Sequence, residues 1–186
     1  MSSKLLFGGA FTCVLPSCSV DISQIRQVPD NQEVFAHLET DQSVLIELLE
    51  YSGDVQGTQA AEYYFNDLAE SNQSRDQKIE SVSEIPKEQI ALHQCCDAYR
   101  LIGCQRVSKF RDEAAASEPP HKVHTEMFLL RLPQHTTDIL LTFNDPYPDL
   151  ASRQHAAKWT SEDFYRICVS LKLVDLSIFP ENVVAH

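Results

Sequence analysis

Lysine and arginine are absent from a long internal block of the chain, residues 27 to 74. The same block contains ten acidic residues: Asp30, Glu33, Glu39, Asp41, Glu47, Glu50, Asp54, Glu62, Asp67 and Glu70. The rest of the chain has all 15 basic residues against 17 acids, so the net charge of −12 is concentrated in one segment. Nucleic acids and anionic membranes bind clustered Lys and Arg, so this distribution argues against both as partners. It favours a basic protein partner or a cation, with a solvated acidic face as the alternative.

Glycine is also scarce, with five residues in 186, which leaves little room for loops that cradle phosphate. The stretch "FGGAF" at 7–11 is too short for such a loop and is typical of a kink between two strands. The chain contains no Walker loop, G-x-G-x-x-G, G-x-S-x-G or H-E-x-x-H motif. No apolar run approaches the roughly 18–20 residues that a membrane helix needs. We therefore expect a soluble chain with no export signal, no cofactor and no covalent catalysis.

The six cysteines are irregularly spaced and form no C-x-x-C motif. They are predicted to be reduced thiols, because a chain of this length can build a core without disulfides. His121 and His124 would lie on opposite faces of a strand, so we expect no metal site there. His93 lies near Cys95, but nothing in the sequence orients its imidazole for catalysis. A deep apolar pocket lined by His93, Cys95 or His124 would instead indicate a hydrolase or a small-ligand site.

The apolar pattern predicts strands that pair in hairpins, with helices inserted between them and one helix closing the chain. Strands are expected at 5–15, 33–38, 77–86, around Gly103 and at 123–146. Helices are expected at 57–71, at the start of 87–112 and at 160–175. Thr58 is the expected cap of the helix at 57–71, and Thr160 or Ser161 that of the helix at 160–175. Loops are expected near 111–122 and 147–158. This order indicates an α+β fold with a mainly antiparallel sheet, in a single domain spanning 1–186.

The stretch "DQSVLIELLE" at 41–50 fits two structures. As a helix it has an apolar stripe, with Glu47 and Glu50 adjacent on the wet side. As a strand it alternates two partly covered faces, and the short polar turn before it favours the second arm of a hairpin. The local pattern favours the helix, but periodicity alone does not decide a run this short.

Four segments occur in an order that resembles the Ran guanine-nucleotide release factor family: "LFGGAFTCVLP", "DISQIRQVPDNQEVF", "TDQSVLIELLE" and "LLRLPQHTTDILLTFNDP". The resemblance implies a PsbP-like fold, an antiparallel sheet of about six strands with helices on both faces, and hence a strand at 41–50. It implies a protein that acts as a monomer in nucleus and cytoplasm during nuclear import. There it would bind the small GTPase Ran and promote release of the bound nucleotide, mainly GTP.

In that family, acidic residues in the stretch matching "VLIELLE" matter for Ran binding, which carries over to Glu47 and Glu50. Asp30 and Glu33, from "PDNQEVF", are added as neighbours in the same acidic half. The expected role of all four is to bind Ran, and no catalytic residue is implied. Some vertebrate members are linked to trafficking of a cardiac sodium channel, so an adaptor of the same fold for another partner is the alternative.

Overall fold

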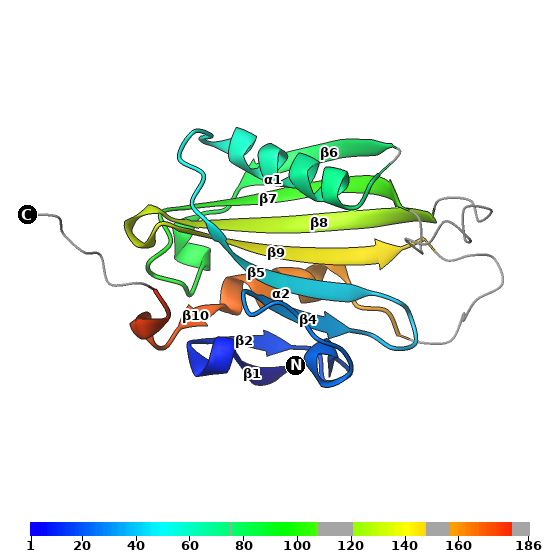
Figure 1. Ribbon diagram of the computed structural model, residues 1–186, viewed down its shortest axis with the longest axis horizontal. Coiled ribbons are helices and arrows are strands. Elements are labelled where there is room, and N and C mark those ends of the chain that lie inside the picture. The colour runs from blue at the N-terminus through cyan, green and yellow to red at the C-terminus, as the bar shows by residue number, and fades with distance from the viewer. Residues whose placement is uncertain (75, 108–120, 148–156, 180–186) are drawn as a thin grey trace, which may run out of the picture.

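The molecule is built on a seven-stranded antiparallel sheet with the strand order β3-β4-β5-β9-β8-β7-β6 (Figure 1). The computed structural model describes residues 1–74, 76–107, 121–147 and 157–179. The strands of this sheet are β3 (Val20–Asp21), β4 (Gln32–Ala36), β5 (Ser43–Glu50), β6 (Gln77–Glu84), β7 (Asp97–Val107), β8 (His121–Leu132) and β9 (Thr137–Pro146). A smaller antiparallel sheet contains β1 (Ser2–Leu6), β2 (Phe11–Leu15) and β10 (Lys172–Leu173).

Two helices cover opposite faces of the large sheet. Helix α1 (Thr58–Ser71) packs on β6, β7 and β8, whereas α2 (Ser161–Ser170) packs with the small sheet on the other face. Side chains alternate along a strand, and on β8 Met127 joins the α1 core while Phe128 joins the α2 core. Figure 1 shows α1 in front of the sheet and α2 behind it. The predicted α+β architecture with helices on both faces is confirmed.

The ambiguous stretch at 41–50 is a strand. β5 lies inside the sheet, paired antiparallel with β4 on one side and with β9 on the other. Val44 and Ile46 are buried in the α2 core, and Leu49 packs against the α1 core. The run looks helical because both faces of this strand are covered, so apolar residues occupy both. The local helical pattern was wrong and the implied strand is right.

The two helices begin differently. Gly57, with φ 61°, precedes α1, and no side chain caps this helix. The expectation that Thr58 caps it is therefore wrong, because Thr58 is already its first residue. Of the two caps predicted for α2, Thr160 is the one present and Ser161 is the first helical residue: the Thr160 hydroxyl accepts from the Asp163 backbone N–H, and the Asp163 carboxylate accepts from the Thr160 N–H. This helix ends at Ser170, earlier than predicted.

In the described part of segment 87–112, residues 87–107, the expected helix is reduced to one 3₁₀ turn at Lys87–Gln89, and β7 follows it. Most of the loops expected near 111–122 and 147–158 lies outside the described residues, but His121 and Lys122 belong to β8. Among the described helices, none has the length and apolarity needed to cross a bilayer.

Candidate partner-binding site

Strands β4 and β5 position the four acids predicted from the sequence. The two strands pair with Gln32 opposite Glu47 and Glu33 opposite Ile46. Because side chains alternate along each strand, Glu47 lies on the α1 face of the sheet and Glu33 lies on the α2 face with Ile46. The register therefore distributes the predicted acids over two faces of one β-ribbon.

Glu47 is partly buried on the α1 face, where the Gln32 side-chain amide donates to its Oε1 at 2.7 Å. Burial raises the pKa of this carboxyl, the hydrogen bond from Gln32 opposes that shift, and Asp67 on α1 raises the pKa further. In the described part of the chain, no Lys or Arg forms an ion pair with Glu47. Such a carboxylate would be stabilised by a cation from outside the molecule.

Glu50 is the exposed last residue of β5, and alternation assigns it to the face of Leu48, opposite to that of Glu47. Its backbone carbonyl accepts from the Tyr64 hydroxyl of α1 at 3.2 Å. The helical interpretation would have put Glu47 and Glu50 side by side. In the strand, the two carboxylates project from opposite faces near the end of β5.

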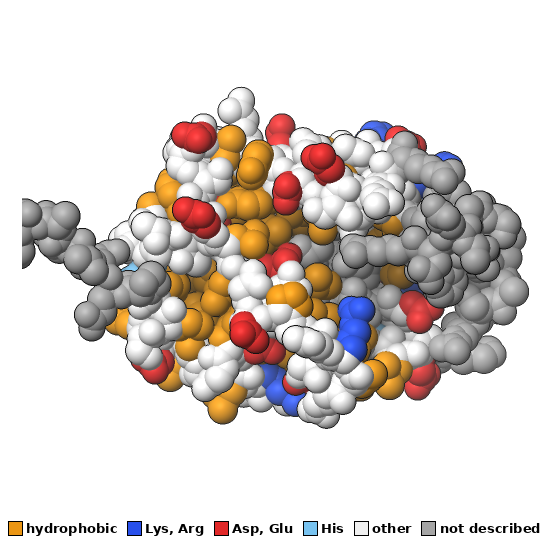
Figure 2. Space-filling view, viewed as in Figure 1, with side chains coloured by type: hydrophobic (Ala, Val, Ile, Leu, Met, Phe, Trp, Pro, Cys, Tyr) orange, Lys and Arg blue, Asp and Glu red, His pale blue; other side chains and the backbone are white. Residues whose placement is uncertain are grey.

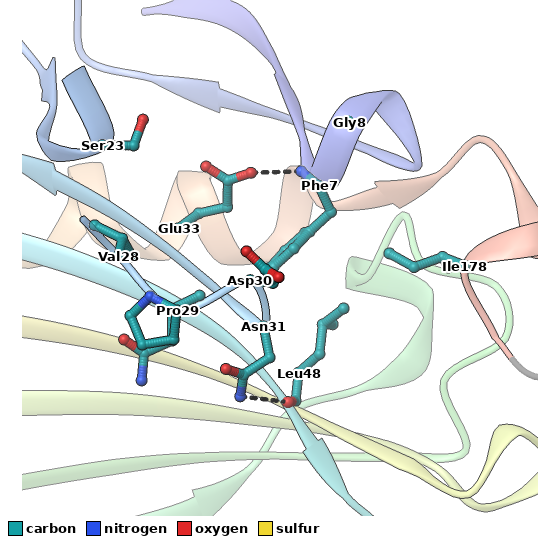
Figure 3. Close-up of a pocket in the computed structure, with 11 residues that line it drawn as sticks. Phe7, Gly8, Ser23, Val28, Pro29, Asp30, Asn31, Glu33, Leu48 and Ile178 are labelled. Carbon is teal, nitrogen blue, oxygen red and sulfur yellow. Dashed lines mark hydrogen bonds between the residues drawn. The ribbon is translucent and has the colours of Figure 1, made fainter.

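Asp30 and Glu33 line a groove of about 540 Å³ on the α2 side of the β4–β5 pair (Figure 3). Oε1 of Glu33 accepts from the Phe7 backbone N–H at 2.5 Å. Burial raises the pKa of Glu33, the hydrogen bond from Phe7 opposes the shift, and Asp21 raises the pKa further. Asp30 lies in the turn before β4, on the rim of the same groove. The structure thus brings Asp30 and Glu33 together and separates them from Glu47.

Gln32 joins the two parts of the site, and the sequence analysis missed it. It lines the groove, and its side-chain amide reaches Glu47 on the α1 face. Its role depends on the cross-strand register, for which the sequence offers no signal beyond the predicted hairpin. Figure 2, which views the α1 face, shows acidic side chains spread among hydrophobic ones, with fewer basic ones.

The residues that could carry catalysis or hold a metal lie apart from the groove or are disfavoured for that chemistry. The groove contains none of His93, Cys95 and His124, so the condition set for a hydrolase site is not met there. Burial raises the pKa of the Cys95 thiol to about 11, which disfavours the nucleophilic thiolate. The described residues include no group of three or more His, Cys, Asp and Glu placed to hold a metal.

A family described as "Ran-interacting Mog1 protein" has a model that matches residues 4–146. The chain belongs to this Mog1 family. The matched region runs from β1 to the end of β9 and includes both faces of the β4–β5 pair. It ends before α2, so Glu47 and most of the groove lining lie in the matched region, whereas the closing helix and Ile178 of the groove do not.

Curated members of the Mog1 family are similar over almost their whole length. The Ran guanine nucleotide release factor of Danio rerio is 45% identical over 186 residues, covering 95% of this chain and 99% of the relative. The Homo sapiens protein of the same name is 43% identical, covering 94% of each. Nuclear import protein mog1 of Schizosaccharomyces pombe is 30% identical, covering 94% of this chain and 98% of its own.

A solved structure agrees with the fold. The crystal structure of the Saccharomyces cerevisiae Ran-binding protein Mog1p superposes with a TM-score of 0.70 at 23% identity. The superposition covers 97% of this chain and 100% of that one. This match supports the α+β architecture independently of the sequence pattern.

Proposed function

We propose that this Mog1-family chain binds the GTPase Ran and promotes release of its bound guanine nucleotide, mainly GTP, during nucleocytoplasmic transport. Support comes from the family and from relatives named as Ran release factors and nuclear import proteins. The observation that carries the proposal is Glu47, a partly buried carboxylate with a raised pKa and no cation beside it among the described residues. Such a group destabilises the free protein and is stabilised when a basic partner arrives.

The action is binding without covalent chemistry. A GTPase holds nucleotide through a lysine and a magnesium ion among mobile switch loops. Carboxylates such as Glu47 and Glu50 can attract those positive groups and compete with the phosphates for them. Release follows only if the factor binds nucleotide-free Ran more tightly than loaded Ran, because the coupling between the two ligands is reciprocal.

The protein is proposed to act as a monomer in the nucleus and the cytoplasm. Asp30 and Glu33 are proposed as further Ran-binding residues, on the other face of the β4–β5 pair from Glu47. An adaptor role for another partner such as a sodium channel stays a prediction.

The test is the rate at which Ran loses a fluorescent GTP analogue. Wild-type protein is compared with Glu47→Lys/Glu50→Lys and with a control of equal charge change, Glu80→Lys/Glu84→Lys. Glu80 and Glu84 are exposed on β6, at the opposite edge of the sheet from β4. We expect acceleration by the wild type and the control, and its loss in the first variant. Failure of the wild type to bind Ran or accelerate release would overturn the proposed function.

A further inference from the structure

Two basic residues lie directly opposite each other where β7 ends and β8 begins. The antiparallel register pairs Arg106 of β7 with Lys122 of β8. Both belong to the α2 face of the sheet, because they follow at alternate positions from Ala98 and Phe128, which are buried in the α2 core. Like charges directly opposite across two strands destabilise the pair. The register therefore places an unfavourable concentration of positive charge at this corner of the sheet.

The surrounding chain compensates these two cations only weakly. Arg106 Nε is 3.8 Å from Asp76 Oδ2, and both of these side chains are more than half exposed, so the ion pair contributes little. Lys122 Nζ lies 4.8 Å from the centre of the Tyr147 ring and forms no ion pair with a described carboxylate. An aromatic ring attracts a cation but leaves its charge in place. An anion from outside the molecule would relieve the repulsion between the two cations.

The next row of side chains adds two further groups on the same face. Lys78 of β6 and His124 of β8 lie on either side of Cys104 of β7, in three strands that are neighbours in Figure 1. Lys78 is exposed and forms no ion pair with a described residue. The hydrogen bond with Glu126 raises the pKa of His124, burial opposes that shift, and nearby carboxylates raise the pKa further. We call the four residues Lys78, Arg106, Lys122 and His124 the basic corner.

Acidic residues border the basic corner on two sides. Asp76 and Glu80 lie on the β6 side, and Asp145 of β9 lies opposite His124 on the other. Asp145 is itself paired with Lys158, at 2.9 Å. A long polyanion such as a nucleic acid would have to pass over these carboxylates, and its binding depends on many phosphate contacts. A short anionic segment fits between them.

We propose that the basic corner binds an extended acidic segment of a protein partner. Side chains on one face of an extended chain repeat about every 7 Å, both in this sheet and in a peptide lying along it. A peptide that runs along β7 and β8 can therefore place one carboxylate between Arg106 and Lys122. The carboxylate two residues away then lies between Lys78 and His124. The planar Arg106 guanidinium can bind a carboxylate through two parallel hydrogen bonds.

This surface lies apart from the acids of β4 and β5, and the inference does not rest on the proposed function. Glu47 is on the α1 face of the sheet, whereas the basic corner is on the α2 face. The two surfaces also have opposite charge, so they select partners of opposite charge. A protein bound at one of them would leave the other open.

The test is a titration followed by heteronuclear NMR of the isotope-labelled protein, which detects weak binding and locates it. The probe is a peptide of about eight residues in which Glu alternates with Thr, so that the carboxylates of an extended chain share one face. The control peptide has Gln in place of each Glu. We expect the Glu peptide to shift the amide signals of residues 76–78, 104–107 and 121–124, and the Gln peptide to leave them unchanged.

Matched variants separate local contacts from overall charge. Lys78→Gln/Lys122→Gln removes two charges from the basic corner, and Lys4→Gln/Lys87→Gln removes two exposed charges from elsewhere. We expect roughly a tenfold loss of affinity for the Glu peptide in the first variant and less than about a twofold change in the second. The same spectra report whether each variant is folded, and Lys122→Gln alone replaces the first variant if it is not.

Three outcomes would overturn the inference. Absence of binding by the wild type, or shifts confined to other residues, would show that the basic corner does not take an acidic segment. An equal loss in the two variants would indicate long-range attraction only. Larger shifts of the same amides with a single-stranded DNA oligonucleotide of equal charge would assign the surface to nucleic acid instead.

Discussion

Arg131 and Asp138 form a buried ion pair across the β8–β9 hairpin, with Arg131 Nε 3.1 Å from Asp138 Oδ1 and both side chains almost fully excluded from water. The remaining Arg131 donors reach the carbonyls of Ser52 and Val55 at 2.6 and 2.7 Å. The guanidinium also lies 4.3 Å from the centre of the Tyr51 ring. One buried arginine thus anchors the segment that follows Glu50 to the centre of the sheet.

Replacing Arg131 with Met should destabilise the protein by about 3–5 kcal/mol, because Asp138 would remain buried without its cation. Urea unfolding followed by circular dichroism measures the loss. The double variant Arg131→Met/Asp138→Leu should lose less than the sum of the two single variants, since neither charge is then left alone. Additive losses would show that the two residues act independently. Hydrogen exchange should also increase in residues 51–55 of the single variant.

Glu47→Gln is expected to stabilise the free protein while weakening Ran binding. The folded pKa of Glu47 is raised above its ordinary value, so its ionised form costs free energy at neutral pH. That cost falls as the pH drops through the folded pKa, because the native state then binds a proton. The Gln oxygen can still accept from Gln32, so the gain should be about 0.5–1 kcal/mol at pH 7.

The measurement is the midpoint of thermal unfolding for wild type and Glu47→Gln at pH 7 and near pH 4.5. The difference between the unfolding midpoints of the wild type and Glu47→Gln should be smaller near pH 4.5 than at pH 7. A variant that is less stable than wild type at neutral pH would contradict the assignment of Glu47 as an uncompensated carboxylate.

Glu126 should show the opposite pH dependence. It is buried on β8, and although burial raises its pKa, hydrogen bonds with His124, Ser161 and Arg100 together lower it to about 2. The closest contact is with Arg100 Nη2, at 2.6 Å. A carboxyl with a lowered pKa stabilises the fold above its ordinary value near 4.5, and that stability is lost as the pH falls toward 2.

Glu126→Gln is therefore expected to lower stability by about 3 kcal/mol at pH 7, because it leaves Arg100 without its buried partner. It should also flatten the decline of stability between about pH 4.5 and 2. Chemical unfolding at a series of pH values measures both effects. A variant that keeps the wild-type acid slope would show that another carboxyl produces it.

The sequence predicted those strands, turns and helix caps that depend only on residues near one another in the chain. The β8–β9 hairpin and a cap of α2 at Thr160 or Ser161 depend on residues close together in the chain; the hairpin is present, and Thr160 is the cap. The resemblance, rather than the pattern, indicated that β5 is a strand. Its two covered faces leave apolar residues on both sides and remove the period of two that marks a strand with one buried face.

The geometry of the site depends on contacts that a sequence does not display. Glu47 and Glu50 are both in β5 as expected, but alternation separates them, and Gln32 faces Glu47 only because of the β4–β5 register. Arg131, inside "LLRLP", had no feature to mark it as buried. Its partner Asp138 is seven residues away in sequence and becomes its neighbour only when the hairpin closes. Whether the four acids bind Ran stays a prediction.

Any side chain at Gly103 on β7 is expected to destabilise the protein. A Cβ there would lie 2.7 Å from the Lys78 carbonyl oxygen and 2.8 Å from Cζ of Phe65, a buried residue of α1. Because one of these neighbours is backbone of the adjacent strand, relief requires β6 or α1 to move. Gly103→Ala should therefore destabilise the protein by about 1–3 kcal/mol.

Gly53→Ala is the matched control, because a Cβ at that position would meet the Tyr51 ring at an ordinary contact distance of 3.5 Å. Its unfolding midpoint should stay close to that of wild type, whereas that of Gly103→Ala should fall clearly. Equal midpoints for the two variants would mean that α1 sits farther from β7 than the structure places it. Since the packing of α1 also sets the position of Asp67 relative to Glu47, a displaced helix in Gly103→Ala should weaken the influence of Asp67 on the Glu47 pKa as well.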